Sequence, residues 1–340
     1  MKAVVVAETG GPEVLRLQDV EDPRPSDTQV VIEVAACGMC GHDQADRMGL
    51  TTIPLPEVLG HEVAGTIVEV GAKVRRFAAG ERVAIKQFTT CGHCRSCLSG
   101  DELRCPEKAF NYGGYSELMA VDESAVLPIP DRVSFADAAV TACAVGTCYQ
   151  ALVRIADLRP GENVVVTGAG GGLGLHGMQV VKALGGVSIA MTSSPDKVDQ
   201  LKLAGADHVV VSGKQAWQDL LDLTGGMGVD VVIDNVGVPG IFSSCFRGMR
   251  HAGRYVFTGQ MTGDRVGIFP AFVFGKEAVI TGSASTLMSS FIASLDLVAS
   301  GAVRPVTRSF PMDDVVVAFT AVDERTVTGR AVLIPGVPRE

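Results

Sequence analysis

Apolar and polar positions follow two different patterns along the chain. Before about residue 144 they alternate in short runs such as "EVAGTIVEV" at residues 62–70, a pattern that is typical of a strand with one buried face. From Pro160 onwards, continuous β-branched runs are separated by helical segments. The second pattern predicts a parallel sheet that is covered by helices on both faces.

The second half of the chain predicts five or six such strands. The first two are Val164 to Thr167 and Ser188 to Thr192, with a helix between them that ends near Leu184. Further strands are expected in "HVVVS", "VDVVIDNVG", "GRYVFTG" and "AVITGSA", with helices in the intervening segments. The repetition of strand and helix predicts a doubly wound Rossmann sheet.

A long apolar helix is predicted between the two patterns, at residues 134–155. Ser134 and Asp137 have the spacing of a capping box at its start. The helix carries Cys143, and a cysteine in such a position is by itself most often a core residue.

The run "CGHCRSCLSGDELRC" at residues 91–105 predicts a metal site. Its cysteines are Cys91, Cys94, Cys97 and Cys105. Four thiolates so close in sequence can bind one tetrahedral zinc ion from a single lobe, and such a closed site does no chemistry itself. Structural thiols do not favour this spacing, and an iron–sulfur cluster would favour C-x2-C-x3-C-P. His93, between the ligands, is expected at the surface.

Two earlier stretches, "ACGMCGHDQADRMG" at 36–49 and "LGHEVAGTIVEVG" at 59–71, carry further metal-ligand types. Cys40 can supply a thiolate, while His61 and Glu62 at the mouth of a strand can direct soft and hard ligands at one ion. A redox pair of Cys37 with Cys40, or ordinary core and loop residues, are the alternatives.

The glycine-rich segment after the first Rossmann strand predicts a dinucleotide site. Gly168, Gly171 and Gly174 form G-x-x-G-x-x-G, with Gly172 in addition. They leave no side chain where a pyrophosphate approaches, and they place amide N–H groups at a helix start. The position between a strand and a helix makes this motif informative.

The end of the second strand indicates which dinucleotide is bound. An acid about 20 residues beyond the glycine loop would hold the ribose hydroxyls of NAD(H). Thr192 occupies that place, and Ser193, Ser194 and Lys197 follow it. Hydroxyl donors and a cation favour the 2′-phosphate of NADP(H) over NAD(H). The alternatives are that Asp196 turns into the site or that the pocket accepts both cofactors.

Composition narrows the classes of partner and compartment. The 340 residues suffice for two domains. A net charge of −9 without runs of like charge disfavours binding to nucleic acids and membranes. A small-molecule partner is therefore expected. The opening "MKAVVVAETG" lacks the features of a signal peptide, and no continuous apolar stretch has the roughly 18 residues of a membrane span. We therefore expect a cytoplasmic protein whose nine cysteines are ligands or buried thiols.

Five motifs follow one another in the order "GMCGHD", "GHE", the four-cysteine run, "CAVGTCYQAL" and the nucleotide-binding pattern. This set and order of motifs resembles the zinc-containing medium-chain dehydrogenase/reductase family, of the alcohol dehydrogenase type. The resemblance extends from Lys2 to Pro335. It implies an enzyme that transfers hydride between NADP(H) and an alcohol, aldehyde or ketone, with two zinc ions per chain. The implied catalytic zinc ligands are Cys40, His61 and Cys143, with Glu62 beside them, and the implied structural zinc ligands are Cys91, Cys94, Cys97 and Cys105.

Other site residues are also implied by the resemblance. Asp43 matches the acid that orients a ligand histidine. Cys37, Cys148 and Cys245 are left as buried thiols. Further cofactor contacts are implied at Asp234 to Gly237, which includes Val236, at Thr258 to Gln260, which includes Gly259, and near Gly282 to Ala284.

The resemblance implies an α/β fold of two domains. Residues 1–144 and 281–340 are expected to form a discontinuous GroES-like, β-rich catalytic domain that carries the zinc lobe at 91–105. Residues 145–280 are expected to form the Rossmann domain. A homodimer or homotetramer is implied, joined through the edge strand near Val279 to Gly282.

Several positions depart from the family pattern. His42 stands where the family usually has the Ser or Thr that passes the alcohol proton outward, Ala45 where many members have the last histidine of that relay, and Gly41 where some have an arginine on the pyrophosphate. His42 could itself be the proton donor, or it could be a loop histidine that hydrogen-bonds the ribose.

The connection from Cys105 to Tyr115 spans only nine residues, fewer than in most members, which implies a more open site lined by Phe110, Tyr112 and Tyr115. These departures, the glycine loop and "ITGSAS" also resemble zinc-containing enoyl-thioester reductases of the acryloyl-CoA type. The alternative function is therefore NADPH-dependent reduction of an activated C=C bond. A cofactor-binding interaction protein without catalysis is a third possibility, against which the intact ligand set argues.

Overall fold

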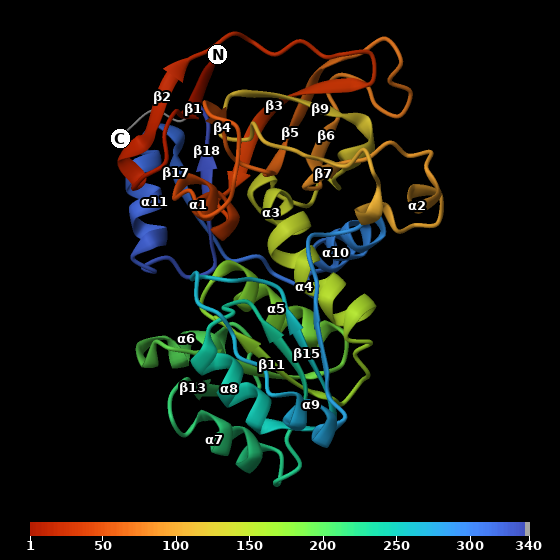
Figure 1. The fold of residues 1–340 in the computed structure, drawn as a ribbon. Helices are drawn as coiled ribbons and strands as arrows, with labels where there is room; N and C mark the ends of the chain where they lie inside the picture. The colour runs from red at the N-terminus through yellow and green to blue at the C-terminus, as the bar shows by residue number, and fades with distance from the viewer. Residues whose placement is uncertain (337–340) are drawn as a thin grey trace. The chain divides into compact units, whose positions relative to one another are not determined.

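The computed structural model describes residues 1–336. The chain folds into two compact units (Figure 1). The first unit comprises Met1–Cys143, Ser285–Ser300 and the chain from Pro305 onwards, and the second comprises Ala144–Ala284 and Gly301–Arg304. The predicted catalytic domain extends to residue 340, and its last four residues lie outside the described part of the chain.

The first unit is built around a seven-stranded sheet in the order β10-β6-β5-β3-β18-β17, with β9 also paired to β3. These strands are β3 (Gln29–Gly38), β5 (Glu62–Val70), β6 (Arg82–Ile85), β9 (Leu118–Asp122), β10 (Val126–Pro128), β17 (Thr307–Pro311) and β18 (Arg330–Ile334). A three-stranded sheet, in the order β2-β1-β4, and a β7-β8 pair complete it. Their strands are β1 (Lys2–Val6), β2 (Leu15–Asp19), β4 (Glu57–Val58), β7 (Phe88–Thr89) and β8 (Ala109–Phe110).

Helices of the first unit lie between these strands along the chain. They are α1 (Gly41–Arg47), α2 (Arg95–Leu98), α3 (Phe135–Val140), α10 (Met288–Ser300) and α11 (Val315–Asp323), with single turns η1 (Pro12–Val14), η2 (Glu102–Arg104), η3 (Glu123–Ala125) and η7 (Met312–Asp314). Strand β3 is the centre of the arrangement, because it pairs with β5, β9 and β18. Its last residue, Gly38, lies opposite Glu62 of β5, so α1 begins beside the start of β5.

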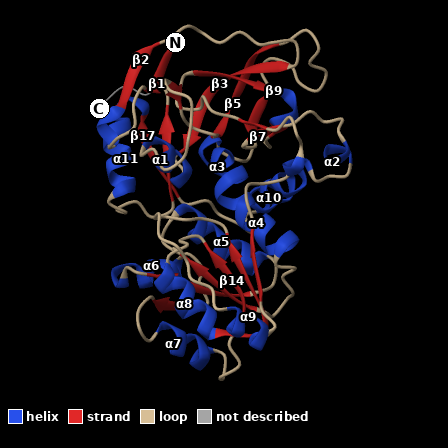
Figure 2. Cartoon of the chain, viewed as in Figure 1, coloured by secondary structure: helices blue, strands red, loops and turns tan. Residues whose placement is uncertain are grey.

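The second unit is a six-stranded parallel sheet in the order β13-β12-β11-β14-β15-β16, which confirms the predicted Rossmann sheet (Figure 2). Its strands are β11 (Asn163–Thr167), β12 (Val187–Thr192), β13 (His208–Val211), β14 (Val229–Asp234), β15 (Met249–Phe257) and β16 (Val279–Gly282). Its helices are α5 (Gly172–Ala183), α6 (Val198–Leu203), α7 (Ala216–Leu223), α8 (Pro239–Gly248) and α9 (Pro270–Lys276), with the turn η6 (Pro195–Lys197).

Alternation along β11 assigns helices to the two faces of this sheet. Val165 belongs to a buried cluster with Leu220 of α7 and Phe246 of α8. Val166 points to the other face, where its Cγ1 lies 3.4 Å from the position that a Cβ would occupy at Gly177 of α5. Successive residues of a strand point to opposite faces, so a continuous apolar run is what a sheet between two helical layers requires.

The long apolar segment at 135–155 is helical but not uniformly α-helical. Ser134 caps it as predicted, because its Oγ accepts the amide of Asp137 at 3.1 Å. A π-turn, η4 (Thr141–Val145), follows α3, and a second π-turn, η5 (Ala151–Ile155), follows α4 (Gly146–Gln150). The segment is long and apolar enough to cross a membrane, but 78% of its most apolar window is buried inside the protein, as in a core helix.

Candidate metal centre and dinucleotide site

Four metal-ligand side chains that are far apart in sequence meet at one point of the first unit. Cys40 precedes α1, His61 and Glu62 open β5, and Cys143 lies in the π-turn η4. One donor atom from each residue lies within 4.8 Å of every other, and the two Sγ atoms are 3.7 Å apart. All four side chains are buried. The structure therefore brings together every residue predicted to surround a catalytic zinc ion.

Asp43 fixes the geometry of this group. Its Oδ1 accepts the amide of Gly60 at 3.2 Å and lies 3.1 Å from Nδ1 of His61. Its Oδ2 accepts the amide of Cys40 at 2.9 Å and the hydroxyl of Tyr115 at 2.8 Å. A carboxylate bonded to Nδ1 leaves the other ring nitrogen of His61 as a lone-pair donor, which is the arrangement that metal-binding histidines require.

Charge in the group is unevenly distributed. The hydrogen bond between the thiols lowers the pKa of Cys40 well below its ordinary value and raises the pKa of Cys143. Burial by itself lowers the pKa of His61, but Asp43 and Cys40 outweigh it and raise that pKa. Burial raises the pKa of Glu62 to about 7, although Arg330 opposes the shift.

The donor set fits a zinc ion. Neither carboxylate oxygen of Glu62 has a hydrogen-bond partner in the described part of the chain, although Nη2 of Arg330 lies 3.2 Å from its Oε1. Arg330 balances one negative charge of the group, and a divalent cation among these donors would balance the charge that the thiolate of Cys40 adds. Two sulfurs, one nitrogen and a nearby oxygen are the ligands that zinc binds in catalytic sites.

The pairing of Glu62 with Arg330 is a feature that the sequence analysis missed. Arg330, on β18, is buried, and its Nη1 donates to the carbonyl of Met39 at 3.1 Å. A Cβ at Gly38 would collide with Oε2 of Glu62, so the glycine makes room for the carboxylate. The available signal was an arginine within an apolar strand, which needs a buried partner.

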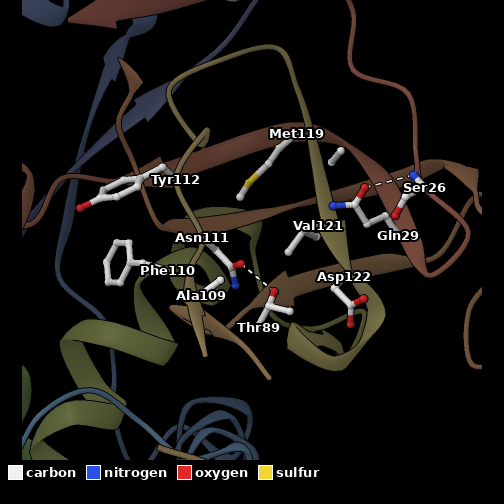
Figure 3. Close-up of a pocket in the computed structure, with 11 residues that line it drawn as sticks. Ser26, Gln29, Thr89, Ala109, Phe110, Asn111, Tyr112, Met119, Val121 and Asp122 are labelled. Atoms are coloured by element: carbon white, nitrogen blue, oxygen red, sulfur yellow. Dashed lines mark hydrogen bonds between the residues drawn. The ribbon is translucent and has the colours of Figure 1, made fainter. Parts of the chain in front are cut away.

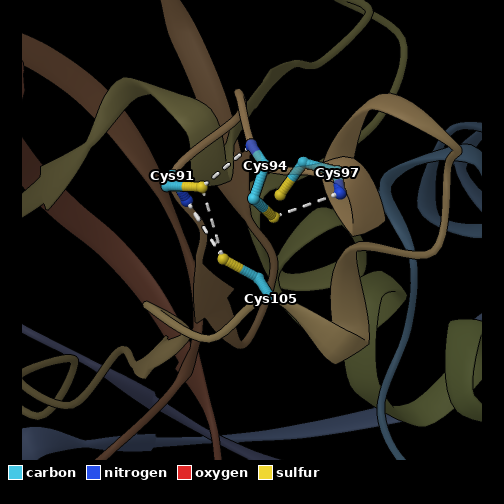
Figure 4. A group of neighbouring side chains, drawn as sticks. All are labelled: Cys91, Cys94, Cys97 and Cys105. Carbon is cyan, nitrogen blue, oxygen red and sulfur yellow. Dashed lines mark hydrogen bonds between the residues drawn. The ribbon is translucent and has the colours of Figure 1, made fainter.

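The second cluster consists of the four cysteines of the lobe around α2 (Figure 4). Their sulfur atoms point towards one another and lie within 4.8 Å, with 3.6 Å between Sγ of Cys91 and Sγ of Cys105. Backbone amides donate to three of the sulfurs at 3.4 to 3.5 Å. Gly92 and Gly100 adopt positive φ angles at the turns. These four donors suit one tetrahedral zinc ion.

The remaining predicted thiols and His93 lie outside both clusters. Cys37, Cys148 and Cys245 are buried, and none of them contributes to either group of potential ligands. His93 is exposed, and its Nδ1 lies 2.8 Å from the carbonyl of Cys91. Cys40 faces Cys143, which is incompatible with the alternative of a redox pair with Cys37.

His42 belongs to a polar group beside the first cluster. Its Nε2 lies 3.5 Å from Oδ2 of Asp46 and 3.5 Å from the hydroxyl of Tyr112, and that hydroxyl donates to Asp46 at 2.9 Å. Asp46 is fully buried and also accepts a short hydrogen bond from Thr51. The sequence analysis missed Asp46, although its position four residues after His42 on one helix face was an available signal.

The short segment after the lobe forms an aromatic wall. The ring of Phe110 lies 4.9 Å from that of His61 and 5.0 Å from that of His42, centroid to centroid. Tyr115 does not face an open site as predicted, because it is fully buried and bonds Asp43. Phe110 and Tyr112 are thus the two predicted lining residues that stand beside the polar group.

A cavity of about 340 Å³ lies on the other side of this wall. Figure 3 shows the side chain of Asn111, bonded to Thr89, pointing into it, while the hydroxyl of Tyr112 points away. Among the described residues its lining includes Phe110 and Tyr112 but none of the four donors. The cavity is therefore separate from the donor group.

The glycine loop of the second unit lies at the carboxyl end of β11, where α5 begins. Gly168 has a φ of +59°, Gly171 is the N-cap of α5, and Gly172 is its first residue. A Cβ at Gly174 would collide with the carbonyl of Gly168, so this glycine permits close contact between helix and loop. Amides without Cβ atoms around them at a helix start fit a pyrophosphate.

The end of β12 lies beside this loop. Thr192 is buried, and its Oγ1 accepts the amide of Ser194 at 3.0 Å, while Ser193 is exposed. The side chain of Lys197 lies over Gly170, with its Cδ 3.0 Å from the position of a Cβ there. A cation is thus held beside the glycine loop.

Asp234 organises the neighbouring strand ends. Its Oδ1 accepts the hydroxyl of Thr167 at 2.7 Å and the amides of Val236 and Gly237 at 3.0 and 3.1 Å. Its Oδ2 accepts the hydroxyl of Tyr255 at 2.6 Å. Asp234 is therefore a buried structural carboxylate rather than a group facing a ligand.

The residues next to Asp234 pack against the glycine loop and against each other. A Cγ2 atom of Val236 lies 3.0 Å from the position of a Cβ at Gly168. A Cβ at Gly237 would lie 2.6 Å from the carbonyl of Gly259. The predicted cofactor positions from three strands thus gather at one edge of the sheet, as parallel strands require.

Two family models match the chain. Residues 26–131 match the model described as "Alcohol dehydrogenase GroES-like domain", and residues 172–300 match "Zinc-binding dehydrogenase". The predicted fold class, a GroES-like domain with a Rossmann domain, is confirmed by these matches and by the parallel sheet.

Similar proteins of two activities are found. An acryloyl-coenzyme A reductase of Metallosphaera sedula is 34% identical over 90% of this chain and 91% of its own length. An NAD-dependent alcohol dehydrogenase of Sulfurisphaera tokodaii is 32% identical over 98% of this chain and all of its own length. A crystal structure of an NAD-dependent alcohol dehydrogenase superposes with a TM-score of 0.94 at 32% identity, covering 99% of this chain and 100% of the other.

Proposed function

Because the chain belongs to the zinc-containing medium-chain alcohol dehydrogenase family, we propose that it transfers hydride between NADP(H) and an alcohol, aldehyde or ketone. The observation that carries this proposal is the convergence of the donor atoms of Cys40, His61, Glu62 and Cys143 in the first unit. Cys91, Cys94, Cys97 and Cys105 would hold a second, structural zinc ion.

Each residue around the first cluster has a separate task in this proposal. A zinc ion held there supplies Lewis acidity, which polarises a carbonyl or lowers the pKa of an alcohol. Asp43 keeps Nδ1 of His61 occupied, so that the ring presents its other nitrogen. Arg330 holds the carboxylate of Glu62 beside the thiols. Phe110 covers the imidazole of His61 and excludes water from it.

We propose that His42 transfers the proton that accompanies hydride transfer. Its imidazole would hold the proton of the alcohol during oxidation and return it during reduction, while Asp46 and Tyr112, which contact its Nε2, hold the ring in place. A His42→Ala variant is expected to lose about 100-fold in kcat while retaining cofactor binding, the scale of general acid–base catalysis. An unchanged kcat with weaker cofactor binding would assign His42 to the ribose instead.

NADP(H) is proposed as the preferred cofactor. The support is local: β12 ends at a threonine, Thr192, and Lys197 lies over Gly170. The two alcohol dehydrogenases described above are named NAD-dependent, so the preference is a prediction about this chain alone. A kcat/KM ratio above 10 for NADP⁺ over NAD⁺ is roughly what one charge-assisted contact gives, and a ratio below 1 would reject it.

The oligomer and the compartment are part of the same proposal. An edge strand, β16, and exposed phenylalanines on and before α9 would join two copies of the chain. A cytoplasmic location is proposed with it, because six of the nine cysteines stand in the two groups of potential metal ligands, a use of thiols that suits a reducing compartment.

Reduction of a conjugated C=C bond is a second candidate. Two similar proteins are named acryloyl-coenzyme A reductase, and this chain has a histidine, His42, where a relay hydroxyl is usual. In that reaction hydride would go to the β-carbon of an unsaturated thioester or ketone, and His42 could deliver the proton to the α-carbon.

One assay separates these functions. The purified enzyme is given aliphatic and benzylic alcohols with NADP⁺ and, separately, aldehydes, enones and unsaturated thioesters with NADPH. We expect alcohol oxidation that Cys40→Ser abolishes. Turnover of conjugated substrates only, without alcohol or aldehyde turnover, would reject the proposal in favour of the second candidate. No turnover with any substrate would favour a non-catalytic cofactor-binding protein.

A further inference from the structure

The carbonyl of Ala142, immediately before Cys143, accepts two side-chain hydrogen bonds from outside its helix. Thr286 donates to it through Oγ1 at 2.6 Å, and Gln87 donates through Nε2 at 3.2 Å. The side chain of Thr286 is fully buried and that of Gln87 nearly so. Ala142, Cys143, Gln87 and Thr286 all belong to the first unit, and neither donor is itself one of the proposed ligands.

Ala142 lies in the π-turn η4, which bears on why its carbonyl accepts side-chain donors. A π-turn interrupts the regular ladder of an α-helix, and such turns are frequent at functional sites. Backbone carbonyls that are buried and displaced from the ladder must find other donors. At the preceding position, Oγ1 of Thr141 donates to the carbonyl of Asp137 at 2.7 Å. Gln87 and Thr286 meet the same need at the carbonyl of Ala142, five residues after Asp137 and next to Cys143.

The two donors are held in place by further contacts. Oε1 of Gln87 accepts the hydroxyl of Ser285 at 3.2 Å. Nζ of Lys86, a buried residue, pairs with Oε2 of Glu102 at 2.8 Å, while the other oxygen of Glu102 accepts a short hydrogen bond from the amide of Met288. The ion pair therefore ties the residue before Gln87 to the start of α10, close to the second donor.

We propose that Gln87 and Thr286 are positioning residues, which hold the backbone at Ala142 so that the thiol of Cys143 stays in the donor group. Cys143 sits in a π-turn whose backbone lacks the full restraint of an α-helix, so these two hydrogen bonds supply the missing restraint. The inference rests on the proposed function, because it presumes that Cys143 is a metal ligand.

Four variants isolate the two hydrogen bonds. Thr286→Val and Gln87→Met each remove a donor and keep the approximate shape of the side chain. Thr286→Ser keeps the hydroxyl. Ser294→Ala is the matched control, because it removes another buried hydroxyl of the first unit, which donates to the carbonyl of Ser290 at 2.7 Å within α10.

The test measures metal retention rather than activity. Zinc release from each purified protein to an excess of chelator is followed by absorbance, and the two clusters are expected to give two phases. Thr286→Val and Gln87→Met should accelerate zinc release from the first cluster about tenfold, which is the lower end of the effect expected when a group that orients metal ligands is removed. The phase of the four-cysteine lobe should stay unchanged. In cobalt-substituted protein, the thiolate absorption should shift in Thr286→Val and return in Thr286→Ser.

Three results would overturn the inference. The first is release from both Thr286→Val and Gln87→Met at the wild-type rate with an unshifted cobalt spectrum. The second is equal acceleration by Ser294→Ala, which would indicate general loosening of the unit. The third is a wild-type protein that binds zinc only in the lobe, which would also reject the proposed function, whereas the first two results leave that function intact. If Thr286→Val does not fold, Gln87→Met decides by the same criteria.

Discussion

Asp43 is the residue on which the geometry of the first metal cluster depends most. It connects the residue before α1, the turn before β5 and the imidazole of His61 through one buried carboxylate. Removing its charge while keeping its shape tests whether that connection matters for metal binding.

Asp43→Asn is expected to weaken zinc binding at the first cluster by about 10- to 100-fold, because an amide no longer fixes the imidazole as a carboxylate does. Competition with a chelator of known affinity measures this, site by site. Tyr115→Phe removes only one of the hydrogen bonds to Asp43 and should have a smaller effect. Equal zinc affinity in Asp43→Asn and wild type would show that the carboxylate has no orienting role.

Functional residues whose type reveals their chemistry were predictable from the sequence. Residues whose role comes from their packing in the folded chain were not. The sequence identifies Cys40, His61 and the four-cysteine run as potential metal ligands, because thiols and imidazoles at such spacing have few other uses. Gln87, Thr286 and Arg330 carry no such signal, because they act through contacts with residues about 55, 144 and 268 positions away. Only the folded chain brings those pairs together.

At the scale of elements, one carboxylate links the two strands β12 and β13 at the edge of the Rossmann sheet. Asp207, just before β13, accepts the amide and the hydroxyl of Ser188 on β12 at 2.9 and 3.1 Å, and Lys182 donates to it at 2.7 Å. Burial by itself raises the pKa of Asp207, but these partners outweigh it and hold the pKa below its ordinary value. The ionised group therefore stabilises the folded state.

Asp207→Asn should lower the free energy of unfolding at pH 7 by about 1 kcal/mol, the value of a typical lost hydrogen bond. Because the pKa is lower in the folded than in the unfolded chain, this contribution is present above the unfolded value and is lost as the pH falls through the folded one. The difference between variant and wild type should thus shrink below about pH 4.

Urea unfolding at pH 7, 5 and 3.5 measures that difference, with Asp296→Asn as the control because Asp296 is exposed on α10. A difference that stays constant with pH would mean that the charge of Asp207 does not contribute. The control should change little at any of these pH values.

Helices and strands were predictable from the sequence where the pattern of apolar and polar residues was long enough to detect. Strand β11 begins one residue before the predicted Val164, and β12 begins one residue before the predicted Ser188. The two-residue strands β4, β7 and β8 are too short to show any alternation. The π-turns η4 and η5 were missed, because inserting one extra residue per turn hardly alters the apolar pattern of a buried helix.

At the scale of the whole molecule, α9 and β16 present apolar surface that the described chain does not cover. Phe272 and Phe274 are 64% and 75% exposed, and β16 is the last strand of its sheet. Exposed aromatic side chains beside an open edge are typical of an interface. We expect a second copy of the chain to bind there.

A Phe272→Lys, Phe274→Lys double variant should shift the protein from dimer or tetramer towards smaller species, with a loss of at least about 2 kcal/mol of association free energy. Sedimentation velocity over a range of concentrations measures this. Leu203→Lys is the matched control, since Leu203 is 88% exposed on α6, beside the opposite edge strand, β13. If the double variant and the control sediment like wild type, α9 is not part of an interface.

The Rossmann half was predictable from its continuous apolar strands, whereas the GroES-like half was implied only by the resemblance to a known family. The order of strands in the first unit was not predictable, because β18 returns from the far end of the chain to pair with β3. Such long-range pairing leaves no local trace, and the resemblance implied only that residues 281–340 return to the catalytic domain.

The central claim is that this chain binds two zinc ions, one of them through Cys40, His61 and Cys143. Elemental analysis of purified protein tests it most directly when wild type is compared with Cys143→Ser. We predict two zinc ions per chain in wild type and one in the variant, retained by the four-cysteine lobe. One zinc ion per chain in both proteins would contradict the account.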